Sequence, residues 1–453
     1  MTGSLYQKVL SGIEEGLGRK DLRAYRHATH VEGAYLFKEW LNESFRKYPS
    51  LRNIYSTGPA LRKRLREIKE YSIDHLEELL SSAKEMLEFN DASVYMARDA
   101  KDALNYIDKN MNDGTTATIP KTYMPWEIGL EEFLDKKGVV LYRNDTGART
   151  VQLMNGDRPP GHGGTWATYA TREQQIEAFS KALGVEIPPE TPRETIVKYT
   201  RREIQSRIDQ SEVGFAGPSA IASDCGAMFF AHNEGNITQT IVSTKKLFVL
   251  AGIDKVVPTW ADGMHIAATY SIHVNFFLGR VIDVICGPSS TDDVRIGNGL
   301  VPFHRATKGA EGAKEVHVVM IDNGRRKALK EGFKEMLYCI NCNACIGCCP
   351  AYVELGAKFK DRDFSGKGLV QGSFIDPLTK VIECGLYSCT GCGKCKQSCI
   401  ANIDIPRLIE KVRANAVKEG LALDPHRAIA ANIGKTGNPF GEPPEARMDW
   451  AAE

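Results

Sequence analysis

The sequence predicts an α/β protein in which a parallel sheet is followed by a smaller helical region rich in cysteine. Two observations lead to this fold class. Between residues 91 and 326 short apolar runs alternate with helical patterns, and ten of the 12 cysteines lie between Cys339 and Cys399. The 453 residues also exceed the roughly 250–300 at which a single core stops growing, so we expect several domains.

The composition excludes several classes of protein. With 58 basic and 57 acidic side chains, the formal charge of +1 offers no electrostatic footprint for nucleic acid. The apolar stretches at residues 247–252 and 273–287 are short or interrupted by Arg280 and Asp283, so we expect no transmembrane segment. The first ten residues lack the basic and apolar regions of a secretory signal. We therefore expect a cytoplasmic protein.

Residues 1–90 predict helices. They are rich in Lys, Arg, Glu and Leu, and their apolar residues recur at helical spacing. The positions that carry this pattern are Leu61, Leu65, Ile68, Leu76, Leu79 and Leu80. We expect this helical region to pack on the α/β domain that follows it.

Residues 91–326 predict the α/β domain. The expected strands are residues 93–97, 139–142, 151–154, 227–231, 248–251 and 316–321, and a helix is expected over residues 101–110. Strands that alternate with helices are typical of a doubly wound parallel sheet. Residues 155–195 interrupt this pattern with clusters of proline and glycine, which predict a surface excursion.

The composition changes abruptly near residue 326, where we expect a domain boundary. The cysteine-rich domain should end in a helix with Asp404 as its N-cap, Pro406 in its first turn and Gly420 at its end. The glycines and prolines of the last residues predict an extended C-terminal arm. The predicted domains are therefore 1–90, 91–326, 327–420 and 421–453.

The cysteine-rich domain contains one motif twice. Residues 339–349 and 389–399 both read C-x2-C-x2-C-x3-C, and each cysteine of the first motif recurs 50 residues later. This is the spacing of bacterial [4Fe–4S] proteins, in which three thiolates bind one cluster and the fourth binds the other cluster. The predicted ligands are Cys339, Cys342, Cys345 and Cys399 for cluster 1, and Cys389, Cys392, Cys395 and Cys349 for cluster 2.

Zinc is the alternative metal, because it also accepts C-x2-C pairs. Zinc usually binds two separated pairs, however, and would leave the rest of the spacing unexplained.

Cys348 and Cys384 lie outside the repeat. They are alternate ligands or small buried apolar residues. Lys394 and Lys396 put positive charge beside the second motif, either raising the potential of its cluster or serving as solvated surface residues.

Five stretches of the α/β region resemble the LUD domain of the lactate-utilisation proteins. They are residues 214–226 (GFAGPSAIASDCG), 232–236 (HNEGN), 252–258 (GIDKVVP), 287–292 (GPSSTD) and 316–325, which ends in DNGR. The whole chain resembles the B-type iron–sulfur protein of that group, in which a LUD domain precedes a two-cluster ferredoxin domain. The resemblance implies a Rossmann-like fold shared with the NagB/RpiA and CoA-transferase superfamily.

The cysteine-rich domain is also similar to the C-type subunits of heterodisulfide reductases. Residues 437–441 (GNPFG), with Arg447 and Trp450, resemble the connector that leads into cysteine-rich CCG domains in fused oxidoreductases of this kind. The resemblance implies that the partner is a separate CCG-domain protein, like the heterodisulfide reductase B subunit, or a flavoprotein, and that the arm reaches it. The alternative is a disordered terminus.

In the α/β region two loops follow strand-like runs and are expected at the carboxyl edge of the sheet, where such folds bind ligands. These loops are residues 233–236 and 287–292; in the second, Gly287, Ser289, Ser290 and Thr291 would bind an anion, or Thr291 or Asp292 would cap a helix. Cys225 is a candidate nucleophile with His232 as its base, or else a structural cysteine. His162 is a further candidate for the same pocket. We assign no catalytic residue.

Three functions compete. The first is an electron-transfer subunit of a cytoplasmic oxidoreductase complex, of the lactate-utilisation or heterodisulfide-reductase type, which relays single electrons while a partner carries out the chemistry. In the second, the LUD domain itself binds or transforms an organic acid or a CoA thioester, with the clusters in support. The third is a zinc-stapled interaction module. Two complete ligand sets and the lack of a complete catalytic constellation favour the first.

Overall fold

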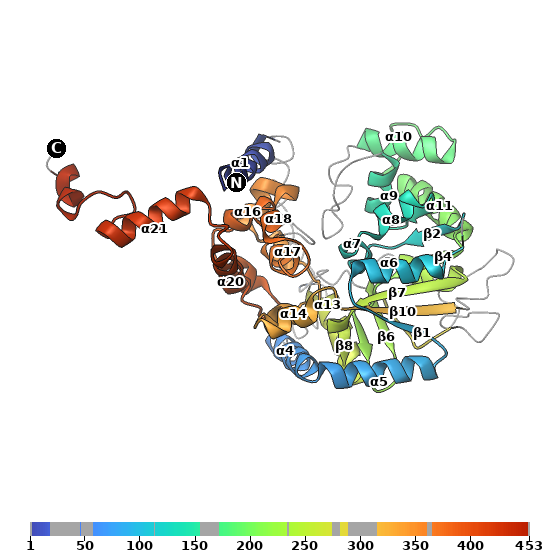
Figure 1. The fold of residues 1–453 in the computed structure, drawn as a ribbon. Helices are drawn as coiled ribbons and strands as arrows, with labels where there is room; N and C mark the ends of the chain where they lie inside the picture. Colours follow the sequence, from blue (N-terminus) through green and yellow to red (C-terminus); the bar gives the residue numbers. More distant parts are fainter. Residues whose placement is uncertain are drawn as a thin grey trace. The chain divides into compact units, whose positions relative to one another are not determined.

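A computed structural model describes residues 2–18, 46, 58–112, 114–154, 172–232, 235–273, 281–288, 315–359 and 365–451 (Figure 1). By its internal contacts the chain divides into two compact units. Unit 1 contains Met1–Gly33, Cys348–Gln397 and Asp404–Glu453, and unit 2 contains Ala34–Gly347 and Ser398–Ile403. None of the helices in the described part of the chain is both long enough and apolar enough to cross a membrane.

Unit 2 is built on a six-stranded sheet in the order β1-β10-β7-β4-β2-β3, and all of its strand pairs are parallel. The strands are β1 (Ser93–Ala97), β2 (Thr116–Ile119), β3 (Val140–Arg143), β4 (Val213–Ala216), β7 (Lys246–Gly252) and β10 (Glu315–Ile321). In the register of the central strands, Val319 lies opposite Leu250 and Phe248 lies opposite Phe215. The central strands β4, β7 and β10 are mostly apolar and buried, as is typical of a parallel sheet covered on both faces.

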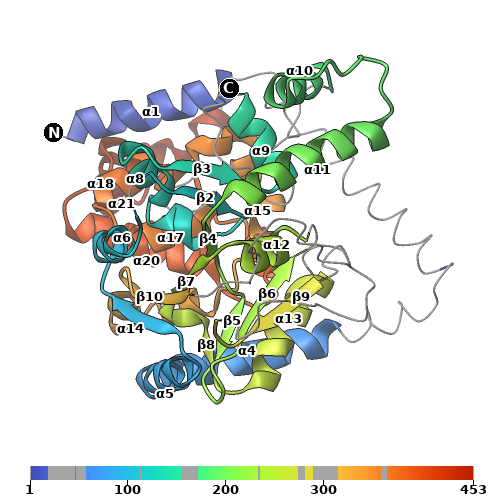
Figure 2. The ribbon, with the colours of Figure 1, turned by 90° about the vertical axis from the view of Figure 1, so that its right-hand side faces the viewer.

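Helices cover both faces of this sheet (Figure 2). On one face, α6 (Ala100–Lys109), α7 (Met124–Glu127) and α8 (Leu130–Lys136) form an apolar cluster with Phe215 and Phe248. On the other face, α12 (Asn236–Ser243) contacts Gly214, where a Cβ atom would lie 2.8 Å from Thr240. The helix α11 (Arg193–Gln210) packs on β2, β3 and α12. The sheet is therefore doubly covered.

A second, smaller sheet has the strand order β8-β5-β6-β9. Its strands are β5 (Ala220–Ala222), β6 (Met228–His232), β8 (Val256–Val257) and β9 (Val281–Ile285). The helix α13 (Trp260–His273) packs on β5 and β6 and contacts α4 (Gly58–Asp74), while α5 (Leu76–Phe89) contacts β8. A Cβ atom at Gly263 of α13 would lie 2.3 Å from the Phe229 ring, so this contact requires glycine.

Most of the predicted strands are confirmed, and one is wrong. The strands predicted over residues 93–97, 139–142, 227–231, 248–251 and 316–321 correspond to β1, β3, β6, β7 and β10. Residues 151–154 instead belong to or follow α9 (Thr146–Leu153), because Asp145 accepts a hydrogen bond from the Ala148 backbone N–H at 3.0 Å and so starts a helix. Of the predicted surface excursion, α10 (Arg172–Leu183) is helical, and residues 155–171 lie outside the described residues.

The cysteine-rich region consists of short helices. In unit 2 these are α14 (Arg325–Lys330), η3 (Lys334–Tyr338) and α15 (Ala344–Gly347). They continue with α16 (Pro350–Leu355), η4 (Gly356–Lys358), α17 (Ser365–Gly372), α18 (Leu378–Glu383), η5 (Leu386–Ser388), α19 (Lys394–Ser398) and α20 (Ile405–Lys418). The predicted final helix is confirmed as α20: the Asp404 carboxylate accepts from the Arg407 backbone N–H at 3.3 Å, and Gly420 follows with φ +74°.

The two ends of the chain differ from the expectation. Helix α1 (Thr2–Gly18) belongs to unit 1, where it packs on α16 and α18 and Lys8 pairs with Glu383 at 2.8 Å. The other described helices of residues 1–90, α4 and α5, belong to unit 2 and contact the strands of the α/β domain. Helical spacing alone does not reveal which surface a helix covers. The arm contains a helix, α21 (Asp424–Thr436), and a 3-10 helix, η6 (Pro444–Ala451). Pro425 in the first turn and Gly437 after the last delimit α21.

Candidate metal centres

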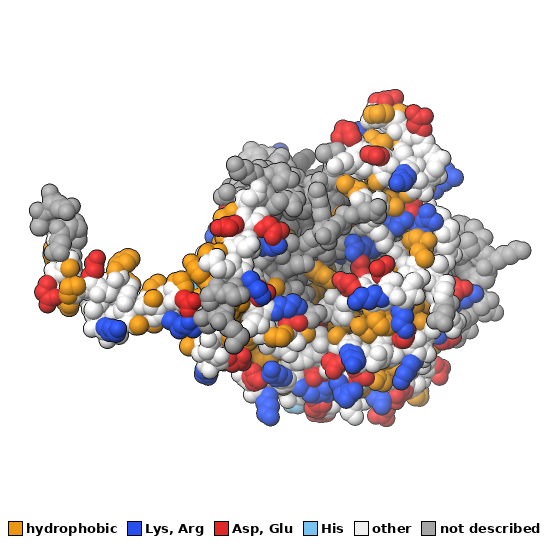
Figure 3. Space-filling model, turned by 45° about the horizontal axis from the view of Figure 1, so that its top comes forward, with side chains coloured by type: hydrophobic (Ala, Val, Ile, Leu, Met, Phe, Trp, Pro, Cys, Tyr) orange, Lys and Arg blue, Asp and Glu red, His pale blue; other side chains and the backbone are white. Residues whose placement is uncertain are grey.

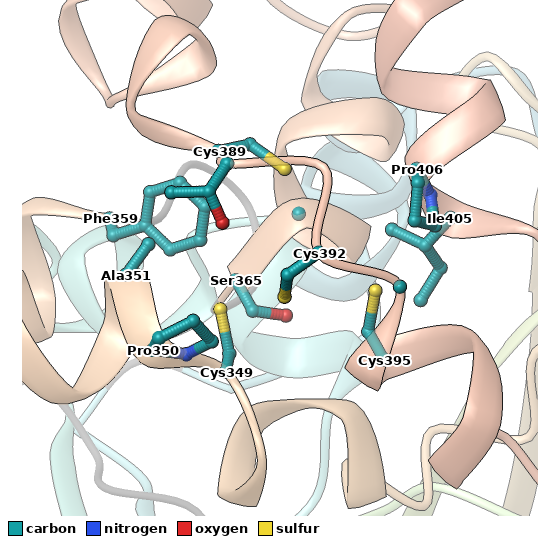
Figure 4. A pocket seen from close by; sticks show the side chains of 13 residues that line it. Cys349, Pro350, Ala351, Phe359, Ser365, Cys389, Cys392, Cys395, Ile405 and Pro406 are labelled. Carbon is teal, nitrogen blue, oxygen red and sulfur yellow. The ribbon is translucent and has the colours of Figure 1, made fainter.

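Four cysteines of unit 1 surround one pocket (Figure 4). Cys389, Cys392 and Cys395 come from the second motif, and Cys349 comes from the end of the first. Their sulfur atoms point toward a common space in Figure 4. The other lining residues carry no charge, and Phe359 makes one apolar wall. The structure thus brings together the four cysteines predicted to bind cluster 2.

Two glycines shape the loop that carries these cysteines. Gly391 has φ +66° and Gly393 has φ +76°, a backbone region that favours glycine. A Cβ atom at either position would meet nothing within 4 Å, so the backbone angle, and not space, explains the residue type. The resulting tight turns let Cys389, Cys392 and Cys395 face the same pocket.

Two thiols of this pocket, those of Cys349 and Cys395, are poorly solvated. Burial raises the pKa of Cys349 to about 11 and the pKa of Cys395 to about 12, and neighbouring cysteines add to both shifts. Thiols with such pKa values carry no charge near neutral pH, so a metal must displace their protons when it binds. Four thiols that converge on an otherwise uncharged pocket are a donor set that fits a [4Fe–4S] cluster, which thiolates hold.

The other four predicted ligands lie in unit 2. Cys339 directly follows η3, and Cys342 and Cys345 are buried. Burial raises the pKa of Cys399, and nearby Cys339 contributes to this shift. The last cysteine of the second motif therefore lies close to the first cysteine of the first motif, as a crossed ligand set requires.

The first motif builds its turns from asparagine. Asn341 and Asn343 have φ values of +56° and +60°, and they occupy the positions equivalent to Gly391 and Gly393. Asparagine is among the few residues that tolerate this region. The Asn341 backbone N–H also donates to the Cys339 sulfur at 3.3 Å. Two different residue types therefore produce the same turn in the two halves of the repeat.

Equivalent cysteines differ in exposure. Cys342 is 8% exposed and Cys345 is 6% exposed. Their equivalents in the second motif are more accessible, since Cys392 is exposed and Cys395 is half-buried. Cys342 and Cys345 of the first motif are therefore less accessible than Cys392 and Cys395 of the second.

In each site a cationic side chain donates a hydrogen bond to the backbone carbonyl oxygen of the first cysteine. The Lys255 ammonium group donates to the Cys339 carbonyl oxygen at 2.9 Å. The Arg413 guanidinium group donates to the Cys389 carbonyl oxygen at 2.7 Å and to the Leu386 carbonyl oxygen at 2.8 Å. Neither cation is predicted by the cysteine motifs. Lys255 lies in one of the stretches that carry the family resemblance, but no pattern in α20 marks Arg413.

The two extra cysteines of this region are half-buried, and neither lines the pocket of cluster 2. Cys348 lies near that pocket, because it contributes to the raised pKa values of Cys349 and Cys395. Cys384 directly follows α18. Their use as alternate ligands stays a prediction.

In the α/β domain, Cys225 and His232 do not form a nucleophile–base pair. Cys225 lies in the turn between β5 and β6, and burial raises its pKa, which disfavours the thiolate. His232 ends β6 and is tied to Asp283, with its Nε2 atom 2.9 Å from the Asp283 Oδ2 atom. At ~3.3 Å per residue, the length of β6 separates the two by roughly 13 Å or more.

The other candidates in this domain are only partly covered. His162, residues 233–234 and residues 289–292 lie outside the described residues. Gly287 is described, and a Cβ atom there would lie 2.0 Å from the Asn90 carbonyl oxygen. Close packing against Asn90 therefore accounts for this glycine without a ligand.

Comparison with known families decides the family of the chain. A profile of the LUD domain matches residues 80–321, which is more than half of the chain. The chain belongs to the LUD domain family. A second profile, of the 4Fe-4S dicluster domain, matches residues 335–403. This LUD domain protein therefore carries two [4Fe–4S] clusters, and the zinc alternative is set aside. The predicted fold class, a Rossmann-like LUD domain followed by a helical two-cluster ferredoxin domain, is confirmed.

Several curated proteins are similar to this LUD domain protein. The uncharacterized electron transport protein YkgF of Escherichia coli is 26% identical over 365 residues, which are 80% of this chain and 72% of the relative. Lactate utilization protein B of Bacillus subtilis is 27% identical over 361 residues, 79% of this chain and 71% of the relative. The protein of the same name from Oceanobacillus iheyensis is 25% identical and covers 81% and 75% of the two chains.

One solved structure is also similar. A crystal structure of a DUF162 family protein from Deinococcus radiodurans covers 54% of this chain and 98% of that chain, with 10% identity and a TM-score of 0.30. This similarity is too low to support an argument about the site.

Proposed function

We propose that this LUD domain protein is the iron–sulfur electron-transfer subunit of a cytoplasmic, multisubunit oxidoreductase. It relays single electrons between a redox site on a partner and an acceptor. In this proposal cluster 1 is held by Cys339, Cys342, Cys345 and Cys399, and cluster 2 is held by Cys389, Cys392, Cys395 and Cys349. The partner carries out the two-electron chemistry, because two clusters alone transfer electrons without choosing a substrate.

The convergence of four cysteines on one pocket carries this proposal. Cys349 is the fourth cysteine of the first motif, yet it lines the pocket of the second motif. Cys399 has the reciprocal relation to Cys339. This exchange is the pattern of two-cluster ferredoxins, in which each motif supplies one ligand to the other cluster. It supports two centres that function together.

The different exposure of the two sites supports a direction for docking. A partner must approach a cluster closely to exchange electrons with it, and Cys392 is exposed whereas Cys342 is buried. We therefore assign the exchange with the partner to cluster 2. Among the described residues of the LUD domain, Cys225 and His232 form no catalytic pair, which is consistent with a subunit that leaves the chemistry to its partner.

The C-terminal arm supports the existence of a protein partner. It exposes the apolar side chains of Ile429, Ile433, Phe440 and Met448. Figure 3 shows hydrophobic groups at the surface of this segment. No residue of α21 is buried. Exposed apolar groups gathered on one segment mark a surface that another protein covers. We propose a CCG-domain protein, like the heterodisulfide reductase B subunit, or a flavoprotein as that partner, with oxidation of an organic acid such as lactate or thiol–disulfide chemistry as its reaction.

Anaerobic purification of the full chain tests this proposal. Two [4Fe–4S] clusters predict about eight irons per chain, brown colour and two reducible signals in electron paramagnetic resonance. Fewer than about six irons per chain, or no reducible signal, would contradict the electron-transfer role. Affinity purification of the native complex then tests the partner. A co-purified flavoprotein or CCG-domain protein is expected with the full chain, and its loss is expected when residues 421–453 are removed.

A further inference from the structure

We propose that Lys255 of the LUD domain sets the reduction potential of cluster 1. This inference rests on the proposed ligand role of Cys339. The Lys255 side chain is 7% exposed, and its ammonium group donates to the Cys339 carbonyl oxygen at 2.9 Å. A positive charge held beside an iron–sulfur cluster stabilises the reduced form, which carries one more negative charge, and so raises the potential. Lys255 is thus the residue through which the LUD domain acts on electron transfer.

The position of Lys255 in the fold explains why this contact exists. It ends the short 3-10 helix η2 (Ile253–Lys255), which directly follows the carboxyl end of β7. Rossmann-like folds bind their ligands at this edge of the sheet. Here the ends of β7 and β10 are instead occupied by five buried charged side chains, Lys69, Glu127, Asp254, Lys255 and Arg325, which we call the edge network.

Direct contacts hold the edge network together. Arg325 makes two hydrogen bonds of 2.8 Å to the two carboxylate oxygens of Glu127, and its Nε atom donates to Asp254. Asp254 also lies 3.5 Å from the Lys255 ammonium group, and its backbone carbonyl accepts from Lys69. Each carboxylate therefore has a cationic partner. Lys255 is consequently held in place on one side by Asp254 and on the other by Cys339.

The edge network has more positive than negative groups. It contains three cations, Lys69, Lys255 and Arg325, and two carboxylates, Asp254 and Glu127, so one positive charge has no carboxylate of its own within the network. Charges in a poorly solvated interior are screened less than charges at the surface. The uncompensated charge therefore acts on whatever the network contacts, and Lys255 is the member that is hydrogen-bonded to Cys339.

Cluster 2 provides an internal comparison. Cys389 is the equivalent of Cys339, and its carbonyl oxygen accepts from Arg413 at 2.7 Å. Arg413 lies on α20 and is half-buried, so solvent screens its charge more than that of Lys255. Both motifs therefore use a cation on the first cysteine, but only cluster 1 takes it from the LUD domain. In the proposed relay the electron gained at cluster 1 comes from the redox partner by way of cluster 2, and its stabilisation requires no proton transfer.

The test is a redox titration of the full chain, loaded with iron and followed by electron paramagnetic resonance. Lys255→Gln keeps a hydrogen-bond donor and removes the charge. We expect it to lower one of the two midpoint potentials by at least about 59 mV, which corresponds to a tenfold change in the one-electron equilibrium constant. Lys255→Arg should restore the potential. Arg413→Gln is the matched control and should lower the other potential by a smaller factor.

A second variant covers the case in which Lys255→Gln fails to bind iron. Lys69→Met removes a charge from the same network without touching Cys339, and it should lower the same potential as Lys255→Gln, by less. The proposal is overturned if these variants leave both potentials unchanged, shift both equally, or shift the one that Arg413→Gln shifts. Two reducible signals in the unmodified protein would still support the electron-transfer role, so the two proposals fail separately.

Discussion

The sites of Cys339 and Cys389 are halves of one sequence repeat, but the structure gives them different surroundings. The first lies in unit 2, with buried cysteines and a lysine supplied by the LUD domain. The second lies in unit 1, with the exposed Cys392 and an arginine from its own helix α20. The spacing of the thiols decides what each site binds, whereas the surrounding residues decide how accessible it is and how its charge is balanced.

The largest effect should come from removing a ligand that one motif is proposed to supply to the cluster of the other motif. Cys399→Ser removes a cysteine of the second motif that lies near Cys339, so it should disturb cluster 1 and remove about half of the iron. The electron paramagnetic resonance spectrum of Cys399→Ser should match that of Cys342→Ser. Cys384→Ser, which lies outside the cluster 2 pocket, is the control and should keep both clusters. A spectrum like that of Cys392→Ser would instead show that each motif binds its own cluster.

The next largest effect is on stability, where a buried ion pair of unit 2 is compared with an exposed one. Arg325→Met leaves Glu127 and Asp254 without their bidentate partner in a buried site, and should lower the free energy of unfolding by about 3–5 kcal/mol. Its neighbour Arg326 pairs with the exposed Glu77, so Arg326→Met should cost at most about 1 kcal/mol. Denaturant unfolding of both variants measures the difference. Equal losses would mean that the edge network does not stabilise the fold.

The edge network also predicts a dependence on pH. Burial lowers the pKa of Lys69 from 10.5 to about 8, with Lys255 and Arg325 adding to the shift and Asp254 and Cys339 opposing it. Because the pKa is lower in the folded protein, the unfolded chain binds more protons between these values, and stability rises as pH increases through this window. The burial of charged Lys69 costs on the order of 3 kcal/mol below pH 8.

Lys69→Met should remove this contribution. Denaturant midpoints of the unmodified protein and of Lys69→Met, measured at about pH 7 and about pH 10, should converge as pH rises. Arg326→Met serves as a control, because its exposed pair has no comparable window. A constant difference between the two proteins across this range would contradict the assigned protonation.

The smallest effect on stability is expected from substitutions in the turns of the two motifs. Gly393 and Asn343 are equivalent positions with similar positive φ values. Gly393→Asn should therefore change stability by less than about 0.5 kcal/mol, whereas Gly393→Val should cost about 1–2 kcal/mol because a β-branched residue disfavours this region. Unfolding midpoints and iron content measure both. If the asparagine variant were as unstable as the valine variant, the turns would not be equivalent.

The sequence predicts best the features that depend on local patterns of residues. The buried strands follow from their apolar runs. The eight candidate ligands follow from the spacing of the repeat, and their roles stay a prediction. The error at residues 151–154 arose because an apolar run of four residues suits a strand or a helix, and the N-cap at Asp145 decided for the helix. Helix α21 is not predicted from the sequence, because the glycines and prolines at its two ends indicate an extended segment.

The features that sequence could not predict depend on contacts between distant residues. Lys69, Glu127, Lys255 and Arg325 come from four separate elements, and no spacing relates them. Arg413 meets Cys389 only because α20 packs beside η5. The motif predicts the crossed ligand sets, but it does not predict that Cys342 is buried and Cys392 exposed. Composition and periodicity carry no information about such contacts.

The crossed ligand sets have a consequence for how the protein is made. With the proposed assignment, the last ligand of cluster 2 to be synthesised is Cys395, and the last ligand of cluster 1 is Cys399, only four residues later. The LUD domain and the first motif leave the ribosome well before this point, yet neither coordination set is then complete. With this assignment, cluster 2 can be completed only after Cys395 has been translated and cluster 1 only after Cys399, and iron delivered earlier would find only partial sites.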